Sequence, residues 1–433
     1  MSVKTIENNH LYWDGCDTVA LAQKYGTPLY VLSENAILQR TQELHQDFID
    51  KYDNVRVAFA SKAFNTVAMC QLVAREGLSL DVVSGGELYT AMKAGFPGEH
   101  IEFNGNNKSQ AELEMAVEYG VGRIIVDGLT EVARLAEICR RLQKTAKILF
   151  RITPEITVDT HDFISTGQKD SKFGIPLNPE ILFPQIEAAI AMPEIEFYGL
   201  HFHIGSQLSD NSTHLAAAKV ALSLVSEIKE RYDFTIKELN YGGGFGVEYV
   251  EGDVRQPYGY FLEPLMALTE DYCAEHGLLR PAIVIEPGRS LVAEAGISLH
   301  TIGEIKTLPG LRTYAAIDGG MTDNIRPGLY QADYTGIVAN KAAAKRTESV
   351  TISGKACEST DILMKDLPVP PLSAGDIFAT LTTGAYGYSM ASNYNKLPLP
   401  AVVLVKDGRD QLIVARQSYE QMIQNERFLE EWD

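Results

Sequence analysis

Residues 238–246 of the chain read ELNYGGGFG, and residues 282–289 read AIVIEPGR. In both segments a short, largely apolar run ends directly in a glycine-containing turn, which is typical of a buried strand followed by a tight loop. Six similar runs precede them in the sequence. The eight predicted strands are 56–60, 80–83, 101–104, 123–127, 148–152, 197–203, 238–241 and 282–286.

The segments between these runs have the length and spacing of helices. Residues 109–119 and 215–230 are amphipathic, and a serine three residues before a glutamate, at Ser84 and at Ser109, is a helix-start signal after the second and third runs. Apolar strands separated by helices indicate a parallel sheet covered by helices. Eight such units over about 240 residues predict a (β/α)8 barrel, in which reactive groups lie at the carboxyl ends of the strands.

A second domain is predicted after the barrel. Beyond residue 290, Gly and Pro are frequent, and β-branched runs such as 349–352 and 401–405 alternate with closely spaced turns, as in an antiparallel β domain. A further strand-like run, 28–32, lies outside the eight barrel units. We therefore assign residues 35–287 to the barrel, and residues 1–34 together with 288–433 to a β-sandwich or β-barrel domain.

The composition limits the possible partners. The 433 residues carry 38 basic and 57 acidic side chains, and the resulting net charge of −19 disfavours nucleic acid and anionic membranes as partners. The five cysteines have no CxxC spacing, which argues against a disulfide framework or a zinc site. No apolar stretch approaches the ~20 residues that span a bilayer. We expect a cytoplasmic protein without nucleic-acid or membrane partners.

Side chains suited to chemistry follow the first and sixth strands. Lys62 follows the first strand, at the rim of a predicted apolar pocket, where desolvation would free an amine for Schiff-base chemistry, although a solvated lysine is the commoner case at a strand end. His201 and His203 fall on one face of the sixth strand. This pair fits metal ligation, stacking on a flat cofactor, or simple core filling. A metal site would need further ligands at other strand ends, so stacking is the better functional interpretation and no metal is predicted.

The last two strands end in residues suited to a phosphate and a cation. The glycine turn containing Gly243 and Gly244 presents several backbone N–H groups to one point, at the place where barrels usually bind phosphate, although such a run can also be merely a tight turn. Gly288 and Arg289 follow the neighbouring strand. Glu286 needs a cationic partner at the barrel mouth, and a pyridinium N–H would serve.

A lysine, a phosphate turn, an imidazole and a carboxylate together indicate pyridoxal 5′-phosphate. In these and other segments the chain resembles the barrel-type, fold-type III pyridoxal-phosphate-dependent decarboxylases, and most closely the diaminopimelate decarboxylase family. The resemblance covers nearly the whole chain. The segments that carry it are 26–31, 60–63, 203–207, 242–246, 286–289, 325–327, 329–330, 357–359 and 384–386.

The resemblance implies an enzyme that decarboxylates meso-2,6-diaminopimelate to L-lysine and carbon dioxide, the last step of lysine biosynthesis. It implies that Lys62 forms the Schiff base with the cofactor, that His203 stacks on the ring, and that Glu286 pairs with the ring nitrogen. The residues implied to hold the phosphate are Ser206, Gly243, Gly244, Gly288 and Arg289.

Further roles follow from the same resemblance. Arg289, Arg326 and Tyr330 are implied to bind a substrate carboxylate, and Glu358 the distal ammonium. Cys357 is implied to donate a proton, and Tyr386 to lie beside cofactor and substrate. The resemblance also implies a homodimer with shared active sites.

Alternatives remain open at this point. Ornithine or arginine would need only an acidic partner for the distal cation, whereas a distal arginine such as Arg326 favours a substrate with a carboxylate at that end. A related decarboxylase for carboxynorspermidine, ornithine or arginine is the nearest rival. A non-catalytic pyridoxal-phosphate-binding protein and a metal-dependent barrel hydrolase are the others. Ser61, Phe64 and the segment 331–334 depart from the pattern of the family. The resemblance therefore specifies the cofactor more strictly than it specifies the substrate.

Overall fold

The computed structural model describes residues 3–154 and 171–430, and the chain divides into two compact units. One unit consists of Gln39–Val247 and Val254–Leu291 and contains the barrel. The other consists of Met1–Leu38, Glu248–Asp253 and Val292–Asp433 and contains the remaining sheets.

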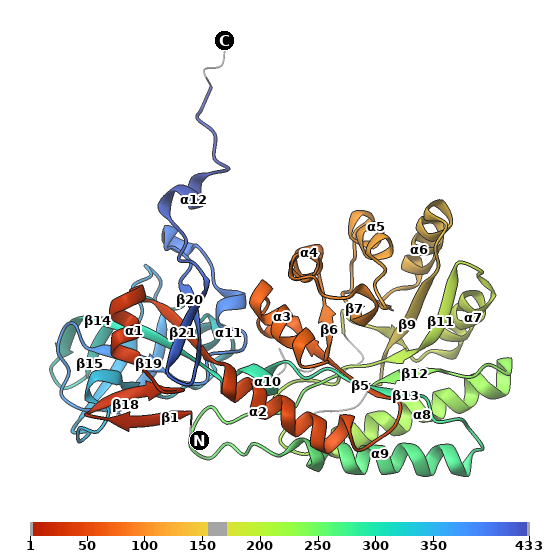
Figure 1. The fold of residues 1–433 in the computed structure, drawn as a ribbon, viewed down its shortest axis with the longest axis horizontal. Helices are drawn as coiled ribbons and strands as arrows, with labels where there is room; N and C mark the ends of the chain where they lie inside the picture. The colour runs from red at the N-terminus through yellow and green to blue at the C-terminus, as the bar shows by residue number, and fades with distance from the viewer. Residues whose placement is uncertain (1–2, 155–170, 431–433) are drawn as a thin grey trace. The chain divides into compact units, whose positions relative to one another are not determined.

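The barrel unit is built on eight parallel strands that close into a ring (Figure 1). The eight predicted strands are confirmed, and their bounds differ from the predicted ones by two residues at most. In the order of their pairing around the ring, which returns from the last to the first, the strands are β5 Val55–Ala60, β6 Ser79–Val82, β7 Ile101–Phe103, β8 Arg123–Val126, β9 Ala146–Thr153, β11 Ile195–His201, β12 Glu238–Asn240 and β13 Ala282–Ile285. A short strand, β10 (Ile175–Pro176), pairs with β9 outside the ring.

Helices follow the strands, as predicted for this architecture. The helices of the barrel unit are α3 Val67–Arg75, α4 Gly85–Ala94, α5 Gln110–Tyr119, α6 Leu129–Leu142, α7 Pro179–Ala191, α8 Ser212–Tyr232, α9 Tyr258–Glu275 and the single turn α10 Arg289–Val292. Along the strands, apolar residues such as Leu80 and Leu239 alternate with polar ones such as Asp81 and Asn240, and all four are buried. Because successive side chains of a strand point to opposite faces, this alternation gives the barrel an apolar layer beneath the helices and a polar layer in its interior.

The two predicted helix starts differ in the structure. At α5 the Ser109 side chain and Glu112 cap each other reciprocally, so the predicted capping box is confirmed. At α4 the Ser84 hydroxyl accepts from the Glu87 N–H, but the Glu87 carboxylate accepts instead from the Val83 N–H at 2.7 Å and from the Ser61 hydroxyl at 3.1 Å. At α4 the Glu87 carboxylate therefore does not close the capping box. It binds Ser61 instead, the residue that precedes Lys62.

The second unit contains a larger mixed sheet and a small one. The small sheet consists of β1 Lys4–Glu7, β2 His10–Trp13 and β3 Cys16–Asp17. The strands of the larger sheet are β4 Leu29–Ser33, β14 Gly296–Leu308, β15 Arg312–Ile317, β16 Gly336–Val338, β17 Glu348–Ser353, β18 Ile362–Val369, β19 Ile377–Thr380, β20 Ala401–Lys406 and β21 Arg409–Val414. Most pairings are antiparallel, as expected. Two are parallel, β15 with β17 and β4 with β20.

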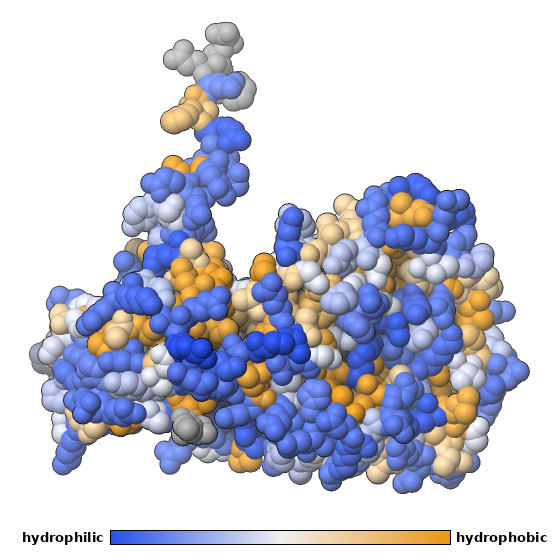
Figure 2. Space-filling view, in the orientation of Figure 1, coloured by the Kyte–Doolittle hydropathy of each residue, from blue (hydrophilic) through white to orange (hydrophobic). Residues whose placement is uncertain are grey.

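The remaining helices are α1 Thr18–Tyr25, α2 Glu34–Leu44, α11 Arg326–Tyr330 and α12 Tyr419–Ile423. A core of buried apolar residues packs around β4, β14 and β20, with Val31, Ile297 and Val403 fully buried. Figure 2 shows hydrophilic and apolar side chains interspersed over the visible face of each unit. Within the part of the chain that the structure describes, no helix combines the length and the apolar character needed to cross a membrane.

Candidate active site

Lys62 lies at the carboxyl end of β5, in the single 3-10 turn Ser61–Ala63. The expected apolar pocket around it is wrong, because its side chain is exposed and its charge interacts with four titratable groups, Asp81, Glu87, His203 and Glu286. The physical reason is that buried strands of a barrel can carry carboxylates and imidazoles on their inward positions. The lysine amine therefore faces an acidic and aromatic set of partners.

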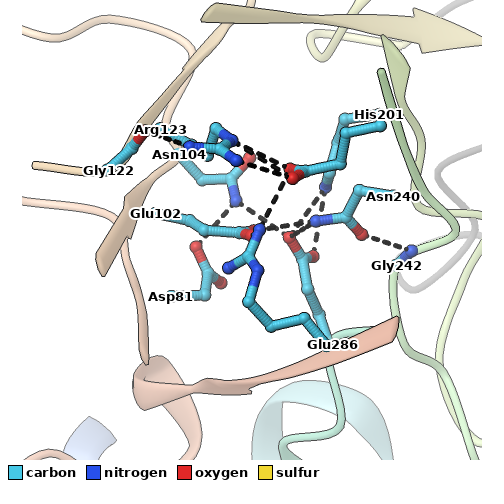
Figure 3. A network of polar contacts seen from close by, with 11 residues as sticks. Asp81, Glu102, Asn104, Gly122, Arg123, His201, Asn240, Gly242 and Glu286 are labelled. Atoms are coloured by element: carbon cyan, nitrogen blue, oxygen red, sulfur yellow. Dashed lines mark hydrogen bonds and ion pairs between the residues drawn. The ribbon is translucent and has the colours of Figure 1, made fainter. Parts of the chain in front are cut away.

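Glu286 follows β13 and lies in a network of polar side chains with His201, Asn240 and Asn104 (Figure 3). Both of its carboxylate oxygens lie 3.1 Å from Nε2 of His201, and Oε1 also accepts from Nδ2 of Asn240 at 2.8 Å. Burial acts to raise the pKa of Glu286, but the charge and hydrogen bond of His201 and the charge of Lys62 outweigh burial and hold the pKa well below its usual range. Glu286 is therefore ionised at neutral pH.

His203 is neutral and has a defined tautomer. Burial, together with the charges of Lys62 and Arg151, holds the pKa of His203 well below its ordinary value. Its Nδ1 accepts from the backbone N–H of Gly243 at 3.2 Å, which leaves the proton on Nε2. The predicted pair of histidines thus separates into two roles, since His201 binds Glu286 while His203 presents an uncharged ring beside the glycine turn.

The glycine turn after β12 packs directly against two neighbouring loops. A Cβ at Gly243 would lie 2.1 Å from the carbonyl oxygen of Glu286, and a Cβ at Gly244 would lie 2.7 Å from that of Gly205. Gly244 also has φ +104°, a conformation that side chains disfavour. Only glycine allows this approach, which brings the backbone of the turn to the ends of β11 and β13.

Arg289 and Ser206 meet beside this turn. The guanidinium Nη2 of Arg289 donates to Oγ of Ser206 at 3.0 Å, and the arginine is buried. At Gly288, an added Cβ would lie 3.0 Å from Cβ of Ala60, so the first and eighth strand ends are also packed closely. A guanidinium, a hydroxyl and glycine amides form a cradle whose donors suit a phosphate, while the ionised Glu286 suits a protonated ring nitrogen. These residues fit pyridoxal 5′-phosphate.

Several residues of the polar layer were not predicted as site residues. Asp81, Asn104 and Asn240 are buried below the mouth, and Nδ2 of Asn104 donates to Oδ1 of Asp81 at 2.7 Å and to Oε1 of Glu286 at 3.3 Å. Burial and the charge of Glu286 raise the pKa of Asp81 well above its usual value. A charged or amide residue inside a predicted apolar strand was the signal that could have identified them.

A group of ion pairs completes this layer. Oε1 of Glu238 lies 3.0 Å from Nη2 of Arg56, and Oε2 of Glu238 lies 3.0 Å from Nη2 of Arg123. Arg56 also forms an ion pair with Glu102. The layer therefore joins β5, β7, β8 and β12 by charge (Figure 3).

Arg326 and Tyr330 belong to the second unit, as the first and last residues of α11. Nη1 of Arg326 donates to the hydroxyls of Tyr249 and Tyr334, at 2.8 and 2.6 Å, and the two tyrosine rings meet edge to face at 5.2 Å. Both tyrosines were missed by the sequence analysis. They hold the guanidinium in a fixed orientation.

Cys357 and Glu358 lie in an exposed loop of the same unit, and Cys357 is the one exposed cysteine of the five. The backbone N–H of Cys357 donates to Oδ1 of Asn395 at 2.6 Å, which ties this loop to the turn at 394–396. Tyr386 has φ +57°, which is uncommon for a bulky residue and persists where the surroundings determine it.

Comparison with known proteins gives a consistent result. Residues 36–293 match the family model described as the pyridoxal binding domain of pyridoxal-dependent decarboxylases. The diaminopimelate decarboxylase of Bacillus subtilis is 46% identical over 417 residues, which cover 96% of this chain and 95% of that protein. That of Bacillus methanolicus is 48% identical over 416 residues, covering 96% of each. The crystal structure of diaminopimelate decarboxylase from M. jannaschii, also solved in complex with L-lysine, matches with a TM-score of 0.93 and 34% identity, over 99% of this chain and 98% of that one.

Proposed function

The chain belongs to the diaminopimelate decarboxylases, within the pyridoxal-dependent decarboxylase family, and we propose that it converts meso-2,6-diaminopimelate into L-lysine and carbon dioxide, the last step of lysine biosynthesis. One observation carries the proposal. An ionised, buried carboxylate at Glu286 and a neutral imidazole at His203 both interact with Lys62 at the carboxyl ends of the barrel strands.

When bound, the cofactor of this family would supply an electron-withdrawing ring for the electron pair of the bond that is broken. Lys62 would hold it through its side-chain amine. Glu286 would favour a protonated ring nitrogen, because an ionised carboxylate stabilises the cationic form of such a ring. His203 would offer an uncharged flat face to the ring.

The phosphate is assigned to the cradle beside the glycine turn. Ser206 and Arg289 supply a hydroxyl and a guanidinium, and Gly243, Gly244 and Gly288 allow backbone N–H groups to approach closely. Against a net charge of −19, such a local cluster is what an anionic group requires.

Residues of the second unit are assigned to the substrate. Diaminopimelate has an amino-acid group at each end, so the end that does not react still presents a carboxylate and an ammonium. Arg326 offers planar donors for that carboxylate, together with Tyr330 and Arg289, and Glu358 matches the ammonium.

Cys357 is assigned as the proton donor. It protonates the carbon that has lost its carboxylate at the D-configured end, and the product is then L-lysine. Tyr386 lies beside cofactor and substrate in this assignment. The backbone hydrogen bond between Cys357 and Asn395 supports it, because a proton donor has to be held in place.

The assembly we propose is a homodimer whose two active sites are shared between subunits, in the cytoplasm and without nucleic-acid partners. The resemblance of the 357–359 segment to the family supports the shared site. The acidic net charge of −19 and the five free thiols support the absence of nucleic acid and a reducing compartment.

The test is product formation from a panel of substrates. The purified chain with added pyridoxal 5′-phosphate should release L-lysine and carbon dioxide in equal amounts from meso-diaminopimelate. The LL isomer, which lacks a D-configured end, is the matched control and should give no product. Turnover of carboxynorspermidine, ornithine or arginine but not of diaminopimelate would contradict the proposed substrate. Cofactor binding without turnover of any substrate would contradict the proposal that the chain is an enzyme.

A further inference from the structure

A second carboxyl group lies behind Glu286 in the barrel interior. Glu102, the middle residue of β7, is fully buried. Nδ2 of Asn240 donates to Oε2 of Glu102 and to Oε1 of Glu286, each at 2.8 Å (Figure 3). One amide nitrogen therefore bridges the two carboxyl groups.

Two carboxylates bridged in this way cannot both be ionised at low cost, because their repulsion is screened little in a buried site. Of the two, Glu286 is the group that is ionised more easily. Nε2 of His201 lies 3.1 Å from both of its oxygens, and the Lys62 ammonium also acts on it. Glu102 is contacted by the Arg56 guanidinium and the Asn240 amide, and among the described residues no histidine or lysine contacts it.

The charged and titratable groups that face Glu102 come from four strands. They are Arg56 from β5, Asp81 from β6, Glu238 from β12 and Glu286 after β13. Behind them, Arg123 from β8 binds Glu238 and His201 from β11 binds Glu286. Three of the four facing groups are acidic.

Among the residues that the structure describes, Arg56 is the one cation in direct contact with Glu102, and its charge is shared with a second carboxylate. The same Nη2 lies 3.0 Å from Glu238, so its charge is divided between two carboxylates. Burial raises the pKa of Glu102, Arg56 lowers it, and Glu286 and Glu238 raise it again, through charge and through a hydrogen bond to Glu286, to about 8. Burial and the two acidic neighbours together therefore outweigh the arginine.

We propose that Glu102 is a positioning residue for Glu286: at neutral pH it remains an uncharged carboxylic acid whose O–H donates to Glu286, so that Glu286 alone carries the negative charge beside the cofactor ring. Together with the Asn240 amide, this proton fixes the orientation of the Glu286 carboxylate. The inference rests on the proposed function, because that function assigns Glu286 to the ring nitrogen.

The protonation state can be read from stability, without any turnover. A raised native pKa means that the folded chain holds a proton on Glu102 that the unfolded chain has already lost, between about pH 4.5 and about pH 8. Over that window the full-length wild-type protein should lose stability relative to Glu102→Gln, which is neutral at every pH. The ratio of the two unfolding constants, measured in urea from pH 5 to 9, should change by up to about tenfold per pH unit and level off above pH 8.

The opposite result would overturn the proposal. If Glu102 were the ionised partner of Arg56, the wild-type protein would gain stability over Glu102→Gln as the pH rises, or the difference would not depend on pH. A Glu102→Gln chain that fails to fold would count against it too, since a neutral isostere should be tolerated. Glu238→Gln is the matched control. It removes the carboxylate that shares Arg56 with Glu102, and it leaves Glu102 itself in place. This variant should be less stable than wild type, and its stability relative to wild type should not rise with pH as that of Glu102→Gln does.

Cofactor affinity supplies the second measurement. At pH 7, Glu102→Gln keeps a neutral donor beside Glu286 and should bind pyridoxal 5′-phosphate within about threefold of wild type. Glu102→Leu removes the donor and should bind it about tenfold to a hundredfold more weakly. Equal affinities for the Gln and Leu variants would overturn the positioning role. If none of the proteins bound the cofactor, the proposed function would fail, and the unfolding data would still report the state of Glu102.

Discussion

Cys357 differs from the other four cysteines in being exposed, and a thiol that must reach a substrate carbon has to be accessible. Cys357→Ala should lower kcat for lysine formation by about 10²–10⁴, the usual contribution of a positioned acid. Cofactor binding should not change, because alanine keeps the backbone N–H that donates to Asn395. Steady-state kinetics and the absorbance of the bound cofactor measure the two effects.

Ser359, an exposed residue two positions further along the same loop, provides the control for this substitution. Ser359→Ala alters the same loop without removing the thiol, and its kcat should stay within about threefold of wild type. Similar losses in both variants would indicate that the loop, and not the thiol, is what matters. A negligible loss in Cys357→Ala would move the proton donor elsewhere.

At the scale of single residues, the sequence identifies groups at strand ends and misses groups inside strands. Lys62 follows a predicted strand, and His203 and Glu286 are the last residues of two others, so their positions draw attention to them. Asn240 lies inside a predicted strand, and Asn104, although it is the last residue of one, was missed. Asn104 contacts Glu286 across 182 residues of sequence, and only closure of the barrel brings the two together.

The turn after β12 is the element on which the proposed phosphate site depends. Gly243→Ala would place a Cβ 2.1 Å from the carbonyl oxygen of Glu286, so the turn would have to move away from the eighth strand. We expect a loss of stability of about 1–3 kcal/mol and at least tenfold weaker binding of pyridoxal 5′-phosphate. Chemical unfolding and a cofactor titration measure these two quantities.

Gly128 offers the matched substitution at a helix start in the same barrel. It has φ −147°, and an added Cβ there would meet nothing within 4 Å. Gly128→Ala should therefore leave cofactor affinity unchanged. If both alanine variants lost affinity equally, close packing of the glycine turn would not be the cause.

At the scale of elements, periodicity predicts which segments are strands and helices but not every partner. The eight barrel strands were predictable because each is a short apolar run beside a helix-length segment. The parallel pairings of β4 with β20 and of β15 with β17 were not, because pairing depends on contacts between segments far apart in the chain. The same holds for Glu87, whose carboxylate binds Val83 and Ser61 rather than closing a local cap.

The proposed sharing of active sites between subunits concerns the whole molecule. Lys62 belongs to the barrel unit and Cys357 to the second unit, so a chain inactivated at either position keeps the other residue intact. If sites are shared between subunits, Lys62→Ala chains mixed and refolded with Cys357→Ala chains should regain about a quarter of wild-type activity, since half of the dimers then hold one complete site of two.

Each variant taken through the same procedure alone is the control and should stay inactive. Complete absence of activity in the mixture, with dimers present by size-exclusion chromatography, would show that each subunit works with its own residues. The assignment of Lys62, His203 and Glu286 to the cofactor would remain, and only the sharing of sites between subunits would be excluded.

The central claim is that the amine of Lys62 binds the cofactor at the mouth of this barrel. The most direct measurement is to reduce the full-length protein with borohydride in the presence of pyridoxal 5′-phosphate, digest it, and locate the modified lysine by mass spectrometry. The account predicts a pyridoxyl group on Lys62 in nearly every chain. A label absent from Lys62, or spread evenly over the surface lysines, would contradict it.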